Sequence, residues 1–475
     1  MKIRKLLFYS IVIFLTLGLV TIGCTEKGVD PTVLEEGSPF DPSKPVVFND
    51  FSPKEGAVRT RVFIEGSNFG TDVSKIKVTI GGKDASVIGC NGTSIYLMVP
   101  PRATDGDVKV TLLNAKGDVA VEHEFDSVFN FKLTTTVSTL TGKIDPSTNS
   151  SSMIDGNFEE AEFEDPWWIE FDKTPEGQRM LYVVEPSKSL RRINLDEKTV
   201  STVFTNGQAG MRAFQTMTFN TTRDTMFFAD DHGRDNREMP VLHYSIRGES
   251  FRKVYPYIYD RTGYSCAQNK YGDLFYNTWF NAGVLKARGE YDAASGEWVG
   301  KRLFNINANN NSAHTYIIMH PDGLYAYLVG ANCVSKSIYN PTTKELTSPT
   351  ILAGSWGSGG YSDAPGTQAR FEEVRQGVFV KNETYVAENR GDVYDFYLCD
   401  LGNHCIRKIT PEGLVSTFAG RGSQTSDNNV EGWIDGDVRE TARFRRPSGI
   451  CYDEENAVFY IADRNNKRIR SISIE

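Results

Sequence analysis

The sequence predicts an all-β protein in which an N-terminal β-sandwich precedes a six-bladed β-propeller. The first observation is a pattern of short β-runs at residues 442–474 that recurs twice upstream, and such internal repetition is the signature of a repeat architecture. The second is a set of alternating apolar and polar runs before residue 127, which is typical of strands with one buried face. The 475 residues are enough for both units.

The chain begins with an export signal. Basic residues precede an apolar run at 6–20, and Cys24 follows a small residue. This pattern resembles a bacterial lipobox, which implies a lipoprotein signal peptide at 1–23 and a lipid on Cys24. Thr21 replaces the usual Leu, so ordinary signal cleavage and a short membrane anchor stay open as alternatives.

Charge and hydropathy restrict the partners of the rest of the chain. The formal net charge is −9 and no basic cluster offsets it, which argues against a nucleic-acid partner. No later stretch is apolar enough to span a membrane. We therefore expect a globular protein that is tethered at its N-terminal end.

Residues 24–43 read as a flexible spacer, and a β-rich unit follows at 44–127. This unit has a Ser-Pro-x-x-Gly at 52–56, a Gly-x-Asn-Phe-Gly at 66–70 and a strand that ends in Val-Pro at 99–100. The three motifs together resemble an IPT/TIG domain. The resemblance implies an immunoglobulin-like sandwich, from which we expect spacing and rigidity and no chemistry.

The repeat joins short elements that are bounded by Gly, Pro, Asn or Asp and rich in Tyr, Val, Ile and Phe. Its last copy holds Ala-Arg-Phe, Pro-Ser-Gly-Ile, Phe-Tyr-Ile-Ala-Asp and Arg-Ile-Arg at residues 442–444, 447–450, 459–463 and 468–470. The same order returns from Ala369 and, less closely, from Ala161. One such sheet cannot bury both faces, so several must stack around a common axis.

These motifs resemble NHL repeats, which implies that residues 130–475 form a β-propeller. We predict six blades from six ends of second strands, although the middle three depart from the family pattern. The six ends are Glu185, Asp230, Asn277, Gly330, Asp400 and Asp463. The last unit has no outer strand of its own, so we expect the strand near 134–141 to complete it and close the ring, which removes an open edge.

The cysteines follow the repeat. Cys266 and Cys451 hold the same position of different blades, and Cys399 replaces an alanine of the pattern. We therefore predict that they are small core residues. A disulfide between Cys399 and Cys405 stays open as an alternative.

Aromatic residues mark the predicted binding face. Connections from second to third strands and from blade to blade emerge on one face, and the long insertions fall there. Aromatic rings beside polar residues suit a sugar, because the ring covers the apolar side of a pyranose. The candidate ligand-binding residues are Trp356, Tyr361, Trp433, Trp279, Trp167 and Trp168. Packing of each ring between blades is the alternative.

We predict no catalytic residue, metal or cofactor from the sequence. The acids at strand ends recur by repeat position, which marks them as turn-forming residues and not as a catalytic pair. Convergence of four histidines on a metal at the channel mouth stays open as an alternative. They are His232, His243, His314 and His320.

A lipid-anchored IPT/TIG unit before an NHL propeller resembles the outer-membrane lipoproteins of polysaccharide utilisation systems in Gram-negative gut bacteria. The resemblance implies a non-catalytic glycan-binding protein on the cell surface, beside a TonB-dependent importer and glycanases. A hydrolase or lyase with a site on the propeller axis, and a scaffold for protein interactions, stay open as alternatives.

Overall fold

The computed structural model describes residues 37–58, 60–100, 104–145, 147–148, 150–279, 283–306, 314–423 and 429–474. The export signal, Cys24 and the first part of the spacer lie outside these residues. Within the described ranges strands dominate, and the α-helices are the short α1 (Asn206–Ala209) and α2 (Glu383–Ala387). No helix there combines the length and the apolar character that crossing a bilayer requires.

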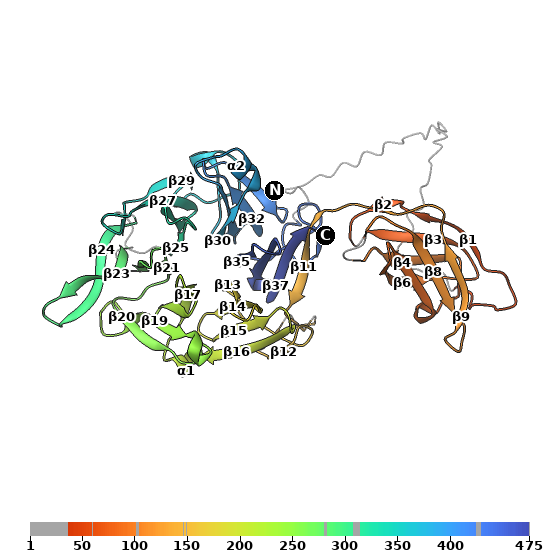
Figure 1. Ribbon diagram of the computed structural model, residues 1–475, viewed down its shortest axis with the longest axis horizontal. Coiled ribbons are helices and arrows are strands. Elements are labelled where there is room, and N and C mark those ends of the chain that lie inside the picture. Colours follow the sequence, from red (N-terminus) through yellow and green to blue (C-terminus); the bar gives the residue numbers. More distant parts are fainter. Residues whose placement is uncertain are drawn as a thin grey trace, which may run out of the picture.

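Two four-stranded antiparallel sheets form the N-terminal unit, which lies beside a ring of further sheets (Figure 1). One sheet has the order β1 (Val47–Ser52), β3 (Arg61–Ser67), β7 (Ser94–Met98) and β6 (Ser86–Cys90). The other has the order β5 (Lys83–Asp84), β4 (Ile76–Ile80), β8 (Val108–Leu113) and β9 (Val119–Glu124). This is the sandwich that the alternating runs predict.

The two sheets bury alternate residues against each other. In β8, Val108, Val110 and Leu112 are buried, whereas the residues between them are partly exposed. A sandwich requires this pattern because neighbours on a strand point to opposite faces. Gly70 and Gly81 have φ of 82° and 54° at turns, a conformation that favours glycine.

The sandwich extends beyond the expected boundary at residue 127. The short strand β10 (Asn130–Phe131) pairs in parallel with β2 (Glu55–Gly56), and Phe129 lies in the sandwich core. The ring of sheets therefore begins with β11 (Thr135–Thr141) and not at residue 130. A two-residue pairing has no periodicity, so the sequence contains no signal for it.

The described residues from 135 to 474 form six antiparallel sheets. Their innermost strands are β13 (Trp168–Lys173), β17 (Phe214–Phe219), β21 (Cys266–Gln268), β25 (Thr315–Met319), β30 (Val374–Lys381) and β35 (Pro447–Asp453). The second strands are β14 (Arg179–Glu185), β18 (Thr225–Asp230), β22 (Leu274–Thr278), β26 (Tyr325–Gly330), β31 (Tyr394–Asp400) and β36 (Val458–Asp463).

The third strands are β15 (Ser189–Asn194), β19 (Pro240–Ile246), β23 (Gly283–Asp292), β27 (Cys333–Asn340), β32 (Cys405–Ile409) and β37 (Arg468–Ile474). Five sheets continue outward with β16 (Thr199–Thr205), β20 (Tyr255–Tyr259), β24 (Glu297–Asn305), β29 (Thr350–Gly354) and β33 (Val415–Ala419). Short strands lie near the outer edges of three sheets: β12 (Gly156–Asn157), β28 (Glu345–Leu346) and β34 (Gly436–Asp437).

The ring closes between the first and the last sheet. The innermost strands contact one another in cyclic order, and β13 packs against β35. Strand β11 supplies the outer strand of the last sheet, because it pairs antiparallel with β37 from Thr135 against Ile474 to Thr141 against Ile469. This is the place that the sequence analysis assigns to the strand near 134–141, and it leaves β37 without a free edge.

A buried glutamine joins three innermost strands across this closure. The Oε1 atom of Gln376 accepts hydrogen bonds from the backbone N–H groups of Ile169, at 3.0 Å, and Ile450, at 3.2 Å. Its Nε2 donates to the carbonyl of Ile169 at 2.8 Å. Because Gln376 is only 2% exposed, its amide takes the place of water for these backbone groups at the ring axis.

The cysteines in the described residues are all buried and unpaired. Cys266 and Cys451 lie on innermost strands, and Cys399 lies on a second strand, as expected for small core residues. The alternative disulfide between Cys399 and Cys405 is wrong, because both are free thiols.

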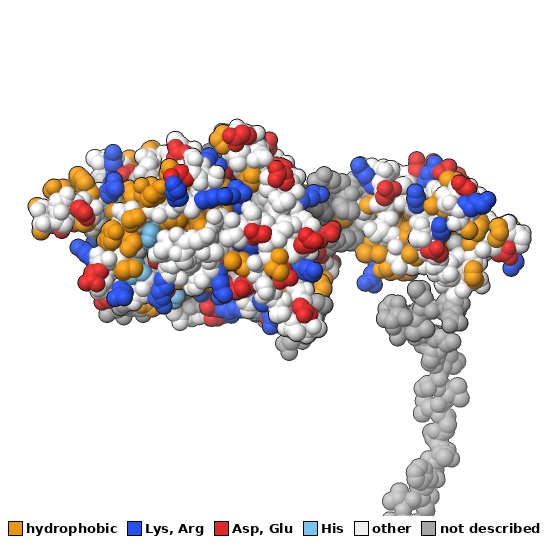
Figure 2. Space-filling model, turned by 90° about the horizontal axis from the view of Figure 1, so that it is seen from below, with side chains coloured by type: hydrophobic (Ala, Val, Ile, Leu, Met, Phe, Trp, Pro, Cys, Tyr) orange, Lys and Arg blue, Asp and Glu red, His pale blue; other side chains and the backbone are white. Residues whose placement is uncertain are grey.

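The face of the molecule that Figure 2 presents carries acidic and basic side chains interspersed with hydrophobic ones. The formal net charge of the whole chain is −9. Interspersed charges provide no extended basic surface on this face for the phosphates of a nucleic acid.

Candidate functional site

Connections between strands emerge on two opposite faces of the ring, because each strand reverses the chain direction. The face that carries the connections from second to third strands and from each sheet to the next is called the loop face. The opposite face, which carries the turns from first to second strands and from third to fourth strands, is called the hairpin face. Residues 354–361 and 429–436 follow outer strands and therefore lie on the loop face.

Side-chain oxygens at the ends of five second strands hold the starts of the innermost strands in the same sheets. These side chains belong to Glu185, Asp230, Asn277, Asp400 and Asp463. In the last sheet, Asp463 Oδ1 accepts a hydrogen bond from the backbone N–H of Arg445 at 2.8 Å. The prediction that the recurring acids form turns is therefore confirmed, and Gly330 is the sixth position without such a side chain.

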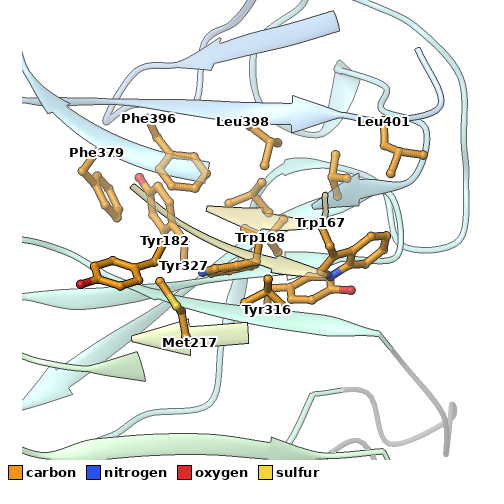
Figure 3. Close-up of a cluster of buried hydrophobic side chains, with 14 of the residues drawn as sticks. Trp167, Trp168, Tyr182, Met217, Tyr316, Tyr327, Phe379, Phe396, Leu398 and Leu401 are labelled. Atoms are coloured by element: carbon orange, nitrogen blue, oxygen red, sulfur yellow. The ribbon is translucent and has the colours of Figure 1, made fainter. Parts of the chain in front are cut away.

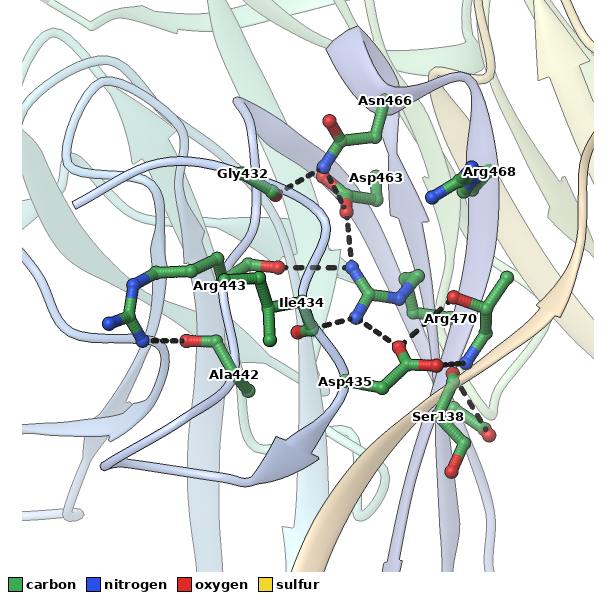
Figure 4. Close-up of polar contacts among 12 residues, drawn as sticks. Ser138, Gly432, Ile434, Asp435, Ala442, Arg443, Asp463, Asn466, Arg468 and Arg470 are labelled. Atoms are coloured by element: carbon green, nitrogen blue, oxygen red, sulfur yellow. Dashed lines mark hydrogen bonds and ion pairs between the residues drawn. The ribbon is translucent and has the colours of Figure 1, made fainter. Parts of the chain in front are cut away.

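A fully buried arginine joins this turn of the last sheet to the loop-face segment before it (Figure 4). Arg470 Nη1 donates to the carboxylate of Asp463 at 2.8 Å and to the carbonyl of Arg443 at 3.0 Å. Its Nη2 donates to the carbonyl of Ile434 at 3.1 Å and to the carboxylate of Asp435 at 2.5 Å. The planar guanidinium suits this task because it donates in two directions at once.

The same arrangement of two carboxylates and two carbonyls surrounds Arg407 and Arg191. Arg407 binds Asp400 at 2.7 Å and Asp363 at 2.6 Å. Like Arg470, both arginines are fully buried. Removal of one partner from a buried ion pair costs about 3–5 kcal/mol, so these contacts hold the loop-face segments of three sheets firmly in place.

Burial raises the pKa of Asp400 to about 6, and the charge of Arg407 opposes this effect. Both carboxylate oxygens of Asp400 accept hydrogen bonds, Oδ1 from the backbone of Glu372 and Oδ2 from Asn403 and Arg407. A carboxylate with all these bonds is a structural group and is not available as a general acid or base.

Trp433 presents an exposed indole on one of these firmly held segments. The side chain is 57% exposed, and the guanidinium carbon of Arg468 lies 4.3 Å from the ring centre. The backbone is held on both sides, because Asn466 donates to the carbonyl of Gly432 at 2.6 Å and Arg470 to that of Ile434. A ring that is already in position loses little conformational entropy when a ligand binds.

Tyr361 occupies the equivalent position of the preceding sheet but is half-buried. Its hydroxyl hydrogen-bonds to Thr417 Oγ1 at 2.6 Å, and the guanidinium carbon of Arg407 lies 4.8 Å from its ring centre. These contacts within the protein therefore cover much of the ring surface that a ligand would need. Trp356 is partly exposed in a tight turn between Gly354 and Gly357, where φ is 82° and 69°.

Trp279 lies at the loop-face mouth of the ring in an aromatic cluster. Its ring centre is 5.1 Å from that of Tyr264 and 4.6 Å from that of His314. The latter two are 4.5 Å apart. Trp279 and His314 keep part of their surface exposed, whereas Tyr264 is buried. Burial also lowers the pKa of His314, which favours the neutral imidazole.

Trp167 and Trp168 differ from the expectation for loop-face rings, since they are only 8% and 4% exposed. Both belong to a core cluster, in which Trp168 lies beside Tyr316 with ring centres 5.7 Å apart (Figure 3). Trp168 begins the innermost strand β13, and Trp167 directly precedes it, with the guanidinium carbons of Arg375 and Arg464 at 5.4 Å and 4.4 Å from its ring centre.

Sequence reasoning missed Trp298, which is as exposed as Trp433 at 57%. It lies on β24 beside Tyr291 of β23, with ring centres 5.6 Å apart. This position adjoins the turn from third to fourth strand and so belongs to the hairpin face. The one available signal was the length of this hairpin, which the repeat pattern does not require.

Sequence reasoning also missed a cavity of about 340 Å³ on the ring axis, which residues from all six innermost strands line. The cavity reaches the hairpin face at Arg223 and Pro321, in turns from first to second strands. Glu170 lies in it, two residues after Trp168 on the same face of β13, and Trp168 Nε1 donates to its Oε1 at 3.0 Å. Burial raises the pKa of Glu170 to about 7, although Trp168 and the charge of Arg223 act in the opposite direction.

His232, His314 and His320 lie in separate settings, whereas the buried His243 is close to His232, and burial together with the charge of His232 lowers its pKa to about 4. His232 Nε2 is 3.0 Å from the carbonyl of Asp260, and His320 Nε2 is 3.3 Å from Asp392 Oδ1. His314 joins the aromatic cluster described above. In the parts of the chain that the structure describes, no three His, Cys, Asp or Glu side chains are placed to hold a metal ion.

Two family models match the chain. The IPT/TIG domain matches residues 45–124, and the NHL repeat matches residues 444–470. No curated protein matches it.

Among solved structures, an auxiliary nutrient binding protein from Bacteroides thetaiotaomicron is 37% identical to this chain, with a TM-score of 0.70. The alignment covers 92% of this chain and 99% of that chain. This chain belongs to the same family. An auxiliary nutrient binding protein from Bacteroides ovatus, 32% identical over 92% of this chain and 100% of that one, has a TM-score of 0.67.

The family also includes a protein from Bacteroides thetaiotaomicron that is described as a putative phosphatase. It is 32% identical over 93% of this chain and 99% of that chain, with a TM-score of 0.68. The similarity to all three proteins spans both units of the fold. The family is therefore defined by the sandwich and the ring of sheets together.

Proposed function

We propose that this protein is a cell-surface lipoprotein that captures oligosaccharide or polysaccharide on the loop face of a six-bladed propeller without cleaving it. Each of the six sheets is one blade. The observation that carries the proposal is the exposed ring of Trp433 on a segment that Arg470 holds in place. Two members of the family are described as nutrient binding proteins, which supports capture as the activity.

The surroundings of Trp433 suit a sugar. Arg468 covers part of the indole, and more than half of the side chain stays open to a ligand. An aromatic face packs against the C–H side of a pyranose, while nearby polar groups bind its hydroxyls.

Several weak contacts on one face favour a long ligand. Trp356 and Trp279 also keep part of their surface exposed on the loop face. One polysaccharide chain that touches more than one of these rings gains from a high effective concentration at the second contact. The proposed ligand is therefore a chain of several sugars.

A lipid on Cys24 would anchor the protein to the outer membrane, and the spacer and the sandwich would hold the propeller away from it. Capture then raises the concentration of the glycan near a TonB-dependent importer and glycanases, which are the proposed partners. A glycan that is bound to this protein is held at a high effective concentration near those partners, for the same reason that a second contact on one surface is favoured once the first has formed.

Affinity electrophoresis across a panel of polysaccharides tests the proposal. We expect Trp433→Ala, and to a lesser degree Trp356→Ala, to weaken retention by the glycan that retains the wild type. Stacking contributes about 0.5–1.5 kcal/mol, which corresponds to a loss of up to about tenfold for Trp433→Ala. The matched control is Trp298→Ala, which removes an equally exposed indole from the hairpin face.

Equal retention of the wild type and Trp433→Ala would reject the loop face as the glycan site. Release of shorter saccharides during the assay would instead indicate a hydrolase or lyase. A protein that no polysaccharide retains would favour the scaffold alternative.

A further inference from the structure

The axial cavity has the features of a ligand site that is separate from the loop face. Its volume of about 340 Å³ is at the lower end of the range of about 300–1,000 Å³ that small-molecule pockets occupy. More of its exposed lining is polar than apolar, and the apolar part comes from residues that include Met217, Met319 and Phe379. A few polar groups converge within it, as ligand pockets usually require.

The aromatic core separates this cavity from the loop face. Trp168 lines the cavity and packs on Tyr316, which is fully buried (Figure 3). On its far side Tyr316 is near Arg375, whose guanidinium carbon is 5.8 Å from the ring centre. Entry is therefore from the hairpin face, past Arg223 and Pro321.

Glu170 is a polar group in the cavity whose capacity to accept hydrogen bonds the protein does not fully satisfy. In the part of the chain that the structure describes, its two hydrogen bonds, from Trp168 at 3.0 Å and Gln376 at 3.3 Å, both end on Oε1. The Oε2 atom therefore remains available to a ligand. A carboxyl group that loses its hydration without full replacement is costly, and a ligand that donates hydrogen bonds to it recovers part of that cost.

The charges at the cavity favour a neutral ligand. Glu170 disfavours an anion where it is charged, and burial raises its pKa to about 7. Arg223 already pairs with the carboxylate of Asp172 at 2.9 Å, so little uncompensated positive charge faces the cavity. An acceptor and a donor that line the same cavity can bind the vicinal hydroxyl groups of a sugar, one of which donates while its neighbour accepts. The apolar part of the lining, which includes Met217 and Phe379, can then cover the C–H face of the same ring.

We propose that the axial cavity binds a single terminal sugar residue, which enters from the hairpin face and hydrogen-bonds to Glu170 and Arg223. The choice of a saccharide rests on the proposed function, whereas the position of the site and its preference for a neutral hydrogen-bonding ligand do not. The small volume restricts the site to chain ends, in contrast to the open loop face.

Saturation-transfer NMR of the full chain with methyl glycosides of glucose, galactose, mannose, xylose and arabinose tests this site. We expect transfer to at least one methyl glycoside in the wild type, and no gain in affinity at this site when the sugar chain is lengthened. Glu170→Gln keeps the side-chain volume but removes the charged acceptor, so we expect about tenfold weaker binding or more. Thr218→Phe fills the cavity, so binding should be lost.

The controls separate this inference from the proposed function. Trp433→Ala should keep the transfer to the methyl glycoside while it loses retention by polysaccharide. Glu170→Gln should show the reverse, and it keeps the test usable if Thr218→Phe fails to fold. Absence of transfer to every methyl glycoside, or equal transfer in the wild type and Glu170→Gln, would overturn the axial site and leave the loop-face proposal intact.

Discussion

Arg470, which is fully buried in β37, donates a hydrogen bond at 2.5 Å to Asp435, two residues after the exposed Trp433. The same carboxylate accepts hydrogen bonds from the backbone and the hydroxyl of Thr139, both at 3.0 Å. Thr139 belongs to β11, the strand that closes the ring. One aspartate therefore links the proposed binding segment to both strands of the closure.

We predict that Arg470→Met destabilises the ring of sheets by about 3–5 kcal/mol, because Asp463 is then left buried without its counter-charge. Asp435→Asn should cost less, about 1 kcal/mol, since Asp435 is partly exposed and asparagine keeps one acceptor. It should still weaken glycan retention by loosening the segment around Trp433. Denaturant titration and affinity electrophoresis measure the two effects, and equal losses of stability would contradict the role of the buried pair.

The raised pKa of Glu170 predicts a pH-dependent stability difference. A pKa of about 7 in the folded protein, against an ordinary value of 4.5, means that the folded state disfavours the charged form. Below pH 4.5 the carboxyl group is protonated in both states and costs the folded protein no stability. As the pH rises from 4.5 through 7, the unfolded state loses its proton first, so the free energy of unfolding falls. Glu170→Gln avoids this loss, so its advantage over the wild type should grow from near zero at pH 4 to as much as about 3 kcal/mol at pH 8.

Thermal midpoints of the two proteins at pH 4 and pH 8 measure this difference. The groups that face Glu170 are the guanidinium of Arg223 and the buried thiols of Cys266 and Cys451. Burial raises the pKa of both thiols, so they stay neutral in this range and do not mask the effect. A difference between the proteins that is the same at both pH values would contradict the assignment to Glu170.

Ring closure by β11 predicts an asymmetry between two valine substitutions. Val137 is fully buried and pairs with Ile472 of β37, whereas Val119 lies on an edge strand of the sandwich and is 62% exposed. We expect Val137→Asp to cost about 3 kcal/mol or more, because it places a charge inside the closure. Val119→Asp should change stability by less than about 0.5 kcal/mol. Similar unfolding midpoints for the two variants would show that β11 contributes little to closure.

The lipobox predicts that substitution of Cys24 changes the cell fraction in which the protein is found. Cys24 is the proposed lipid attachment site, and a serine in its place cannot carry the thioether-linked lipid. We expect Cys24→Ser to move the protein from the membrane fraction to the soluble fraction or the medium, while Cys90→Ser stays in the membrane fraction. Immunoblots of separated fractions measure this. A Cys24→Ser protein that remains with the membrane would favour anchoring by the apolar run at 6–20.

Local sequence patterns predicted the sandwich, the turns and the ring closure. Val108, Val110 and Leu112 show the alternation that one buried face requires. Asp463 and Asp400 recur at strand ends because each must accept the backbone N–H groups of its own sheet. These interactions join residues whose spacing repeats, so a single sequence contains their signal.

The sequence by itself determined that this chain forms a β-sandwich and a ring of antiparallel sheets with long segments on one face. Only the tertiary structure decided which rings are accessible, burying Trp167 and Trp168 and exposing Trp298. It also decided that an axial cavity exists and that Glu170 lies in it. The physical reason is that these properties depend on six strands meeting at one axis, where Gln376 bonds to Ile169 across 207 positions of the chain. Periodicity encodes which face of a strand is buried, but not which distant side chain meets it there.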